Sequence, residues 1–141
     1  MAFISVTRLR ARSIRFLPTI VLHTLRSRKQ LREAPGFIGG YLATSPQWAF
    51  WTVTVWTDEA SMKAYRNSGS HLRAMPKLIG SCDEAAVAHW TSAGPVIPQP
   101  DEVARQIEGG RTSKVRYPSA AHAAGQCWSD GQVPRKGPSL P

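Results

Sequence analysis

Three tryptophans lie within nine residues of a segment whose pattern predicts a β-hairpin followed by a capped helix. They are Trp48, Trp51 and Trp56. The hairpin strands are expected at Phe37–Thr44 and Trp48–Thr57, on either side of a Ser45-Pro46-Gln47 turn. Because a buried tryptophan removes a large apolar area from water, these side chains must line a core, a ligand pocket or a subunit interface.

Alternating apolar residues predict two further strands, at Ala2–Leu9 and Glu84–Thr91. A helix is expected from Leu17, and a second, opened by Asp58 and Glu59, is interrupted by glycine and serine before a helical piece at His71–Ile79. The first helix is predicted to face inward through Leu17, Ile20, Val21, Leu25 and Leu31, and outward through His23, Arg26, Lys29 and Arg32.

This order is βαββαβ over residues 2–92, which predicts a ferredoxin-like α+β domain with a four-stranded antiparallel sheet. Both helices would cover one face of the sheet. The other face would be bare, apolar and aromatic, which predicts a homodimer. We place the domain at residues 1–92. Residues 93–141, rich in proline, glycine and serine, form a tail that either wraps the domain or is disordered, with one short helix at 101–108.

The charge of +9 is concentrated near the start of the chain, where eight basic residues occur before the first acidic one, Glu33. Such a face suits phosphates, anionic membrane lipid or an acidic ligand, or is simply solvated. The aromatic strand lacks interleaved Lys or Arg, which disfavours nucleic-acid binding. Phe16–Leu25 is too short and polar for a membrane span, and two cysteines give no disulfide framework, so we expect a reducing, cytoplasmic setting.

The candidate site residues gather around the second predicted helix. His71 follows the Gly/Ser break, where it could ligate haem iron, shuttle protons or merely be solvated, and Asn67 precedes it by four residues. Trp56 shares a strand face with Thr52 and Thr54, a mixed wall typical of ligand pockets or of a core. Further candidates for the same wall are Tyr65, Ser5 and Thr7, whereas His89 is expected to be structural. Known nucleotide, hydrolase and metal motifs are absent from the sequence.

The stretches FISVTRLR, APGFIGGYL, FWTVTVWTDEASMKAYRNSGSH and AMPKL resemble small bacterial proteins related to spheroidene monooxygenase and to antibiotic biosynthesis monooxygenases. The resemblance covers about residues 2–92 and implies a dimeric α+β barrel. That superfamily includes cofactor-free oxygenases, haem-degrading oxygenases and haem-binding dehydratases. Thr7, Tyr65 and Met75 stand where the haem-degrading branch has its Asn, Trp and His, so that branch's motif is not retained.

Two functions follow as expectations. The first is a monooxygenase-like protein, with haem or no cofactor, that binds haem or a small apolar substrate between the second helix and the sheet. His71 and Asn67 would be catalytic, and His71, Tyr65, Trp56 and Thr54 would contact the cofactor or ligand, with His71 as the haem-iron ligand and no other metal site. The second is a non-catalytic dimeric module that binds a small ligand or a partner.

Overall fold

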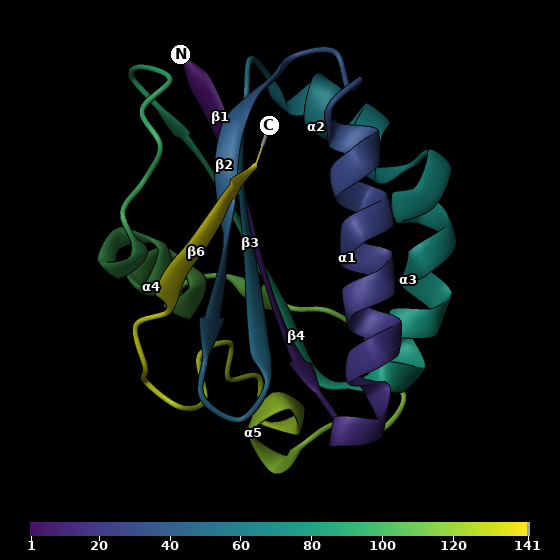
Figure 1. The fold of residues 1–141 in the computed structure, drawn as a ribbon. Coiled ribbons are helices and arrows are strands. Elements are labelled where there is room, and N and C mark those ends of the chain that lie inside the picture. Colours follow the sequence, from purple (N-terminus) through teal and green to yellow (C-terminus); the bar gives the residue numbers. More distant parts are fainter. Residues whose placement is uncertain (141) are drawn as a thin grey trace.

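A six-stranded antiparallel sheet forms the centre of the computed structural model, which describes residues 1–140 (Figure 1). In spatial order the strands are β5 (Arg111–Thr112), β4 (Cys82–Ser92), β1 (Ala2–Ala11), β3 (Ala49–Trp56), β2 (Phe37–Ser45) and β6 (Arg135–Leu140). The four inner strands have the ferredoxin-like order, which confirms the predicted α+β class. The predicted number of four strands is wrong, because β5 and β6 extend the two edges of the sheet.

Helices lie on both sides of this sheet (Figure 1). One side carries α1 (Leu17–Leu31), α2 (Glu59–Arg66) and α3 (Gly69–Ser81); the other carries α4 (Pro100–Glu108), while α5 (Ala120–Ala123) lies at one end. A 3-10 turn, η1 (Ile14–Phe16), leads into α1. The predicted start of α2 is confirmed: Asp58 is its N-cap, and its carboxylate accepts a hydrogen bond of 2.7 Å from the Ser61 amide.

The tryptophans of the hairpin have three different surroundings. Trp51 and Trp56 are fully buried on opposite faces of β3, as the two-residue period of a strand requires. Trp48 is 44% exposed and lies in the turn, where Gln47 and Trp48 both have positive φ. The prediction that Trp48 begins the strand is therefore wrong.

The sheet face opposite α1 is covered by the chain itself. Trp51, Val53 and Val55 have no exposed surface, and they share one apolar cluster with Val103 and Ile107 of α4. Trp128 packs against the same cluster. The predicted bare face is wrong, because residues 93–140 fold back over it. A homodimer stays a prediction, but it loses the physical reason that the sequence suggested.

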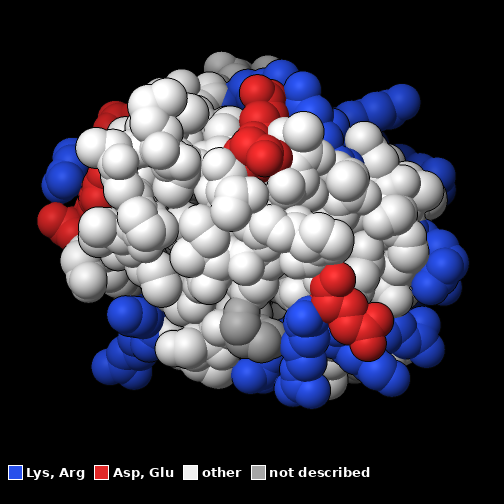
Figure 2. All heavy atoms as spheres, turned by 90° about the horizontal axis from the view of Figure 1, so that it is seen from above, with Lys and Arg blue, Asp and Glu red and all other residues white. Residues whose placement is uncertain are grey.

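Helix α1 is rotated about its axis relative to the prediction. Val21 and Leu25 are 46% and 55% exposed, whereas His23, expected in solvent, is buried at 6% exposure. The helix has apolar residues on several sides, so contacts with α3 and the sheet decide which side faces inward. Figure 2 shows Lys and Arg along the right-hand rim of the molecule, with no Asp or Glu visible on that rim. This is the side on which Figure 1 places α1 and α3.

A buried ion pair links the sheet to the C-terminal segment. Arg8 of β1 donates a hydrogen bond of 2.8 Å to Glu84 of β4, and both residues are at most 2% exposed. Ser129 and Ser119 donate to the same carboxylate at 2.6 and 2.7 Å. Burial alone would raise the pKa of Glu84, but these hydrogen bonds and the charge of Arg10 outweigh it and leave that pKa below its ordinary value.

We predict that Glu84→Gln lowers the free energy of unfolding by about 3–5 kcal/mol, because it leaves the Arg8 guanidinium buried without its main counter-charge. The matched control is Glu59→Gln. Glu59 is 53% exposed and pairs with Lys63 at 3.1 Å on the surface of α2, so its loss should cost at most about 0.5 kcal/mol. Urea unfolding measures both variants. Equal effects would show that the Arg8–Glu84 pair contributes no more than a surface pair.

Candidate functional site

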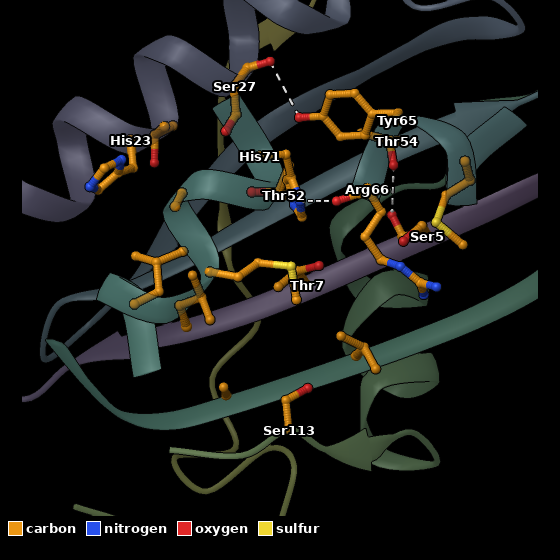
Figure 3. Close-up of a pocket in the computed structure, with 18 of the residues that line it drawn as sticks. Ser5, Thr7, His23, Ser27, Thr52, Thr54, Tyr65, Arg66, His71 and Ser113 are labelled. Atoms are coloured by element: carbon orange, nitrogen blue, oxygen red, sulfur yellow. Dashed lines mark hydrogen bonds between the residues drawn. The ribbon is translucent and has the colours of Figure 1, made fainter. Parts of the chain in front are cut away.

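A cavity of about 520 Å³ lies between the helix layer and the sheet (Figure 3). Its floor is a set of hydroxyls on two neighbouring strands, because Ser5 pairs with Thr54 and Thr7 with Thr52 in the β1–β3 register. The expectation that Ser5 and Thr7 extend the polar wall beside Trp56 is thus confirmed. Side chains from α1, α2 and α3 form the roof.

Aromatic rings stack along one wall of the cavity. Ring centroids are 5.4 Å apart between Trp56 and Tyr65, and 5.1 Å apart between Tyr65 and His71. The Tyr65 hydroxyl donates a hydrogen bond of 3.3 Å to the carbonyl of Ser27 on α1, as Figure 3 shows. Burial raises the pKa of Tyr65 to about 12. Tyr65 therefore stays a neutral phenol and shapes the wall rather than accepting protons.

The His71 ring is held in one tautomer. Its Nδ1 lies 3.1 Å from the backbone carbonyl of Arg66 (Figure 3). Because a carbonyl only accepts hydrogen bonds, Nδ1 carries the proton and Nε2 carries the lone pair. Burial lowers the pKa of His71, and the nearby charge of Arg66 lowers it further, against the opposing effect of the hydrogen bond. The imidazole is thus neutral near pH 7, with a basic nitrogen at the cavity wall.

Gln30 of α1 fixes the backbone around this histidine. Its side-chain oxygen accepts a hydrogen bond of 2.9 Å from the His71 amide, and its Nε2 donates to the carbonyls of Tyr65 and Ser68 at 3.1 and 3.0 Å. The junction between α2 and α3 is therefore tied to α1. Nothing in the sequence pattern singles out Gln30, because a glutamine near a helix end is ordinary.

The structure brings the predicted site residues to one cavity. All five predicted residues are among those that line it: Thr54, Trp56, Tyr65, Asn67 and His71. Asn67 is exposed at the end of α2, where its side-chain oxygen accepts a hydrogen bond of 3.3 Å from Arg66. Sequence reasoning missed many other lining residues, among them His23, Ser27 and Arg66. His23 was missed because the side of α1 that faces inward was misassigned.

The cavity lining carries positive charge. Its cations are Arg28, Arg66, Arg111 and Lys114, and no Asp or Glu of residues 1–140 is part of the lining. His89, on β4 opposite Ser5, also lines it. Burial lowers the pKa of both His23 and His89, and neighbouring Arg and Lys side chains lower both further. The site therefore favours an electron-rich or anionic ligand.

Comparison with known proteins relates this geometry to one family. Residues 19–77 match the model of the family described as "Antibiotic biosynthesis monooxygenase". No curated protein matches the sequence. Solved structures share the fold at low identity. SnoaB, a cofactor-independent oxygenase from Streptomyces nogalater, is 15% identical with a TM-score of 0.56, covering 70% of this chain and 98% of its own.

Two further solved structures share this fold. Rv0793 from Mycobacterium tuberculosis is 11% identical with a TM-score of 0.61, over 67% of this chain and 97% of its own. PA3566 from Pseudomonas aeruginosa is 12% identical with a TM-score of 0.58, over 66% and 95%. The family match spans α1 to α3, the elements that roof the cavity, and agrees with the resemblance of the sequence motifs. The family match over residues 19–77 and the shared fold together relate this chain to the antibiotic biosynthesis monooxygenase-like α+β barrel proteins.

Proposed function

We propose that this protein binds a small, largely apolar molecule in the cavity between the helix layer and the sheet and oxygenates it, with His71 as the proton acceptor. The observation that carries this proposal is the His71 ring, which is neutral, fixed in one tautomer and bordered by an aromatic wall. A concave cavity in which aromatic and aliphatic walls meet placed polar groups is typical of small-molecule sites. A base with a pKa near or below neutrality suits proton abstraction at pH 7.

The chemistry follows from the groups present. A CH₂ group activated by a conjugated carbonyl would lose a proton to Nε2 of His71. Dioxygen, as co-substrate, would oxidise the resulting enolate; one oxygen atom would remain as a carbonyl and the other would leave as water with the two hydrogens. The cations in the lining would stabilise the enolate, because no carboxylate in the lining opposes them. This route needs no cofactor, as in the oxygenase from Streptomyces nogalater.

A haem-dependent version rests on the same residues. His71 would hold the haem iron through the lone pair of Nε2, and Arg66, Arg111 or Lys114 would hold the haem carboxylates. When bound, haem would supply the activation of dioxygen. Metal-ligating histidines usually donate their other ring N–H to a carbonyl or carboxylate, as Nδ1 of His71 does to the Arg66 carbonyl. Titration with hemin separates the versions, since ligation by His71 would shift and sharpen the Soret band of hemin, a change that His71→Ala would lose.

A non-catalytic binding module is the alternative, because among residues 1–140 no second acid or base of the lining is hydrogen-bonded to the His71 ring. Oxygen uptake with a tricyclic ketone such as anthrone decides between the two. Binding of anthrone without oxygen consumption, together with an unshifted Soret band of hemin, would leave only the binding module.

We predict that His71→Ala lowers the rate of oxygen uptake with anthrone about 100- to 10,000-fold, the usual contribution of a general base. Anthrone binding should change little, since the aromatic wall and hydroxyl floor remain. Leu72→Ala is the matched control, because Leu72 is the next residue on α3, is 48% exposed and does not line the cavity. An unchanged rate in His71→Ala would remove His71 from the mechanism.

We also predict that stability falls as the pH drops below about 6.5, the ordinary value for histidine. The pKa values of His23, His71 and His89 are all lowered in the folded protein. Below pH 6.5 the unfolded chain therefore binds more protons than the folded chain, which favours unfolding. The contribution of these neutral histidines to folding stability is fully present above pH 6.5. It is lost as the pH falls toward their lowered pKa values in the folded protein. Each histidine contributes at most about 1.4 kcal/mol per pH unit.

Urea midpoints measured between pH 8 and pH 5.5 test this expectation for His71 in particular. His71→Gln should give a shallower loss of stability with acid than the unmodified protein. Carboxylates titrate at lower pH, and the same variant leaves them in place. Parallel curves for the two proteins would contradict the lowered pKa of His71.

A further inference from the structure

The outward side of α1 is apolar, although the helix belongs to a strongly basic chain. Val21, Leu22 and Leu25 are exposed at 46%, 45% and 55%. Positions i, i+1 and i+4 of a helix share one side, so these three side chains form one patch, which we call the α1 outer patch. The opposite side of α1 holds buried Ile20, His23 and Leu31. The helix therefore presents apolar residues both to the fold and to solvent.

Only positive charges accompany the α1 outer patch along its helix. Arg26 and Lys29 are exposed on α1, and exposed Arg15 lies in the preceding turn. The sequence contains no Asp or Glu before Glu33. Among residues 1–140, no carboxylate forms an ion pair with these three cations. The basic right-hand rim in Figure 2 belongs to this side of the molecule.

We propose that α1 docks side-on to the surface of an anionic lipid bilayer, with Val21, Leu22 and Leu25 among the acyl chains and Arg26 and Lys29 on the lipid phosphates. Helices that lie in a membrane interface have this combination of an apolar side and flanking basic residues. Anionic lipid attracts Arg and Lys close to its surface. No helix within residues 1–140 is long and apolar enough to cross a membrane, so the proposed contact is peripheral.

A second copy of the chain fits this surface less well. Pairing two α1 helices through the same patch would bring Arg26 and Lys29 of one copy against those of the other. Three aliphatic side chains also supply far less area than a stable protein interface buries. An anionic surface removes the charge conflict, and a bilayer accepts small apolar side chains without a shaped partner.

The inner side of the same helix lines the cavity through His23, Thr24 and Ser27. Docking through the outer side would place the cavity next to the membrane. An apolar ligand dissolved in the bilayer would then have a short path to its site. The docking itself does not depend on oxygenase chemistry, because the patch contains no residue assigned to that reaction.

Sedimentation with vesicles tests the proposal. The full chain should bind vesicles of phosphatidylglycerol and phosphatidylcholine and ignore vesicles of phosphatidylcholine alone. Leu22→Ser/Leu25→Ser should weaken this binding about tenfold or more, because the apolar contribution is removed. Arg26→Ser/Lys29→Ser should weaken it and reduce its dependence on salt.

The matched control is Val96→Ser/Val133→Ser, which changes two loop residues that are 72% and 53% exposed elsewhere on the surface. This variant should bind as the unmodified protein does. Three outcomes would overturn the proposal: no binding to anionic vesicles, equal binding to neutral vesicles, or equal losses in the control and the Leu22/Leu25 variant. A dimer in sedimentation velocity that Leu22→Ser/Leu25→Ser dissociates would assign the patch to a second copy instead.

Discussion

The Arg8–Glu84 pair is the interaction on which the arrangement of the chain depends. Two charges buried in a sheet are stable only when hydrogen bonds satisfy them. The C-terminal segment supplies those bonds through Ser119 and Ser129, with Asp130 at 3.5 Å from Arg8. These bonds fix the C-terminal segment at one end of the sheet. The rest of residues 93–140, including α4, lies over the adjoining sheet face. A polar network and an apolar cluster thus hold the same segment in place.

Most of the inner sheet and much of the site could be predicted from local pattern. The period of two in β1 and β3 separates hydroxyls from Val and Trp, and antiparallel pairing then brings Ser5 beside Thr54. The cap at Asp58 fixes the start of α2, and therefore the side on which Tyr65 meets Trp56. The position of His71 in the first turn of α3 could be predicted from the Gly/Ser break between α2 and α3. The strand periods, the Asp58 cap and the Gly/Ser break are each specified by residues within a few positions of one another, and the ferredoxin-like order then supplies the pairing of β1 with β3.

The missed features depend on contacts distant in sequence. Strand β6 contains Gly137 and Pro138, which argue against a strand; it forms because the edge of β2 offers unpaired backbone groups. Burial of α4 likewise requires the completed sheet. For α1, apolar residues on several sides make the helical pattern ambiguous, and contacts with α3 and the sheet, together with the hydrogen bonds of Gln30 to the α2–α3 junction, accompany the observed rotation. No local signal marks these long-range contacts.

Covering the sheet from within the chain changes where apolar surface remains exposed. In a ferredoxin-like domain without residues 93–140, Trp51 and Val53 would be the apolar face left to a partner. Here that face is a closed core, and the outward side of α1 keeps Leu22 and Leu25 in solvent. The cavity lies on the α1 side of the sheet as well. Exposed apolar side chains and cavity-lining side chains therefore occur on the same helix, whereas the opposite face of the sheet belongs to the apolar core.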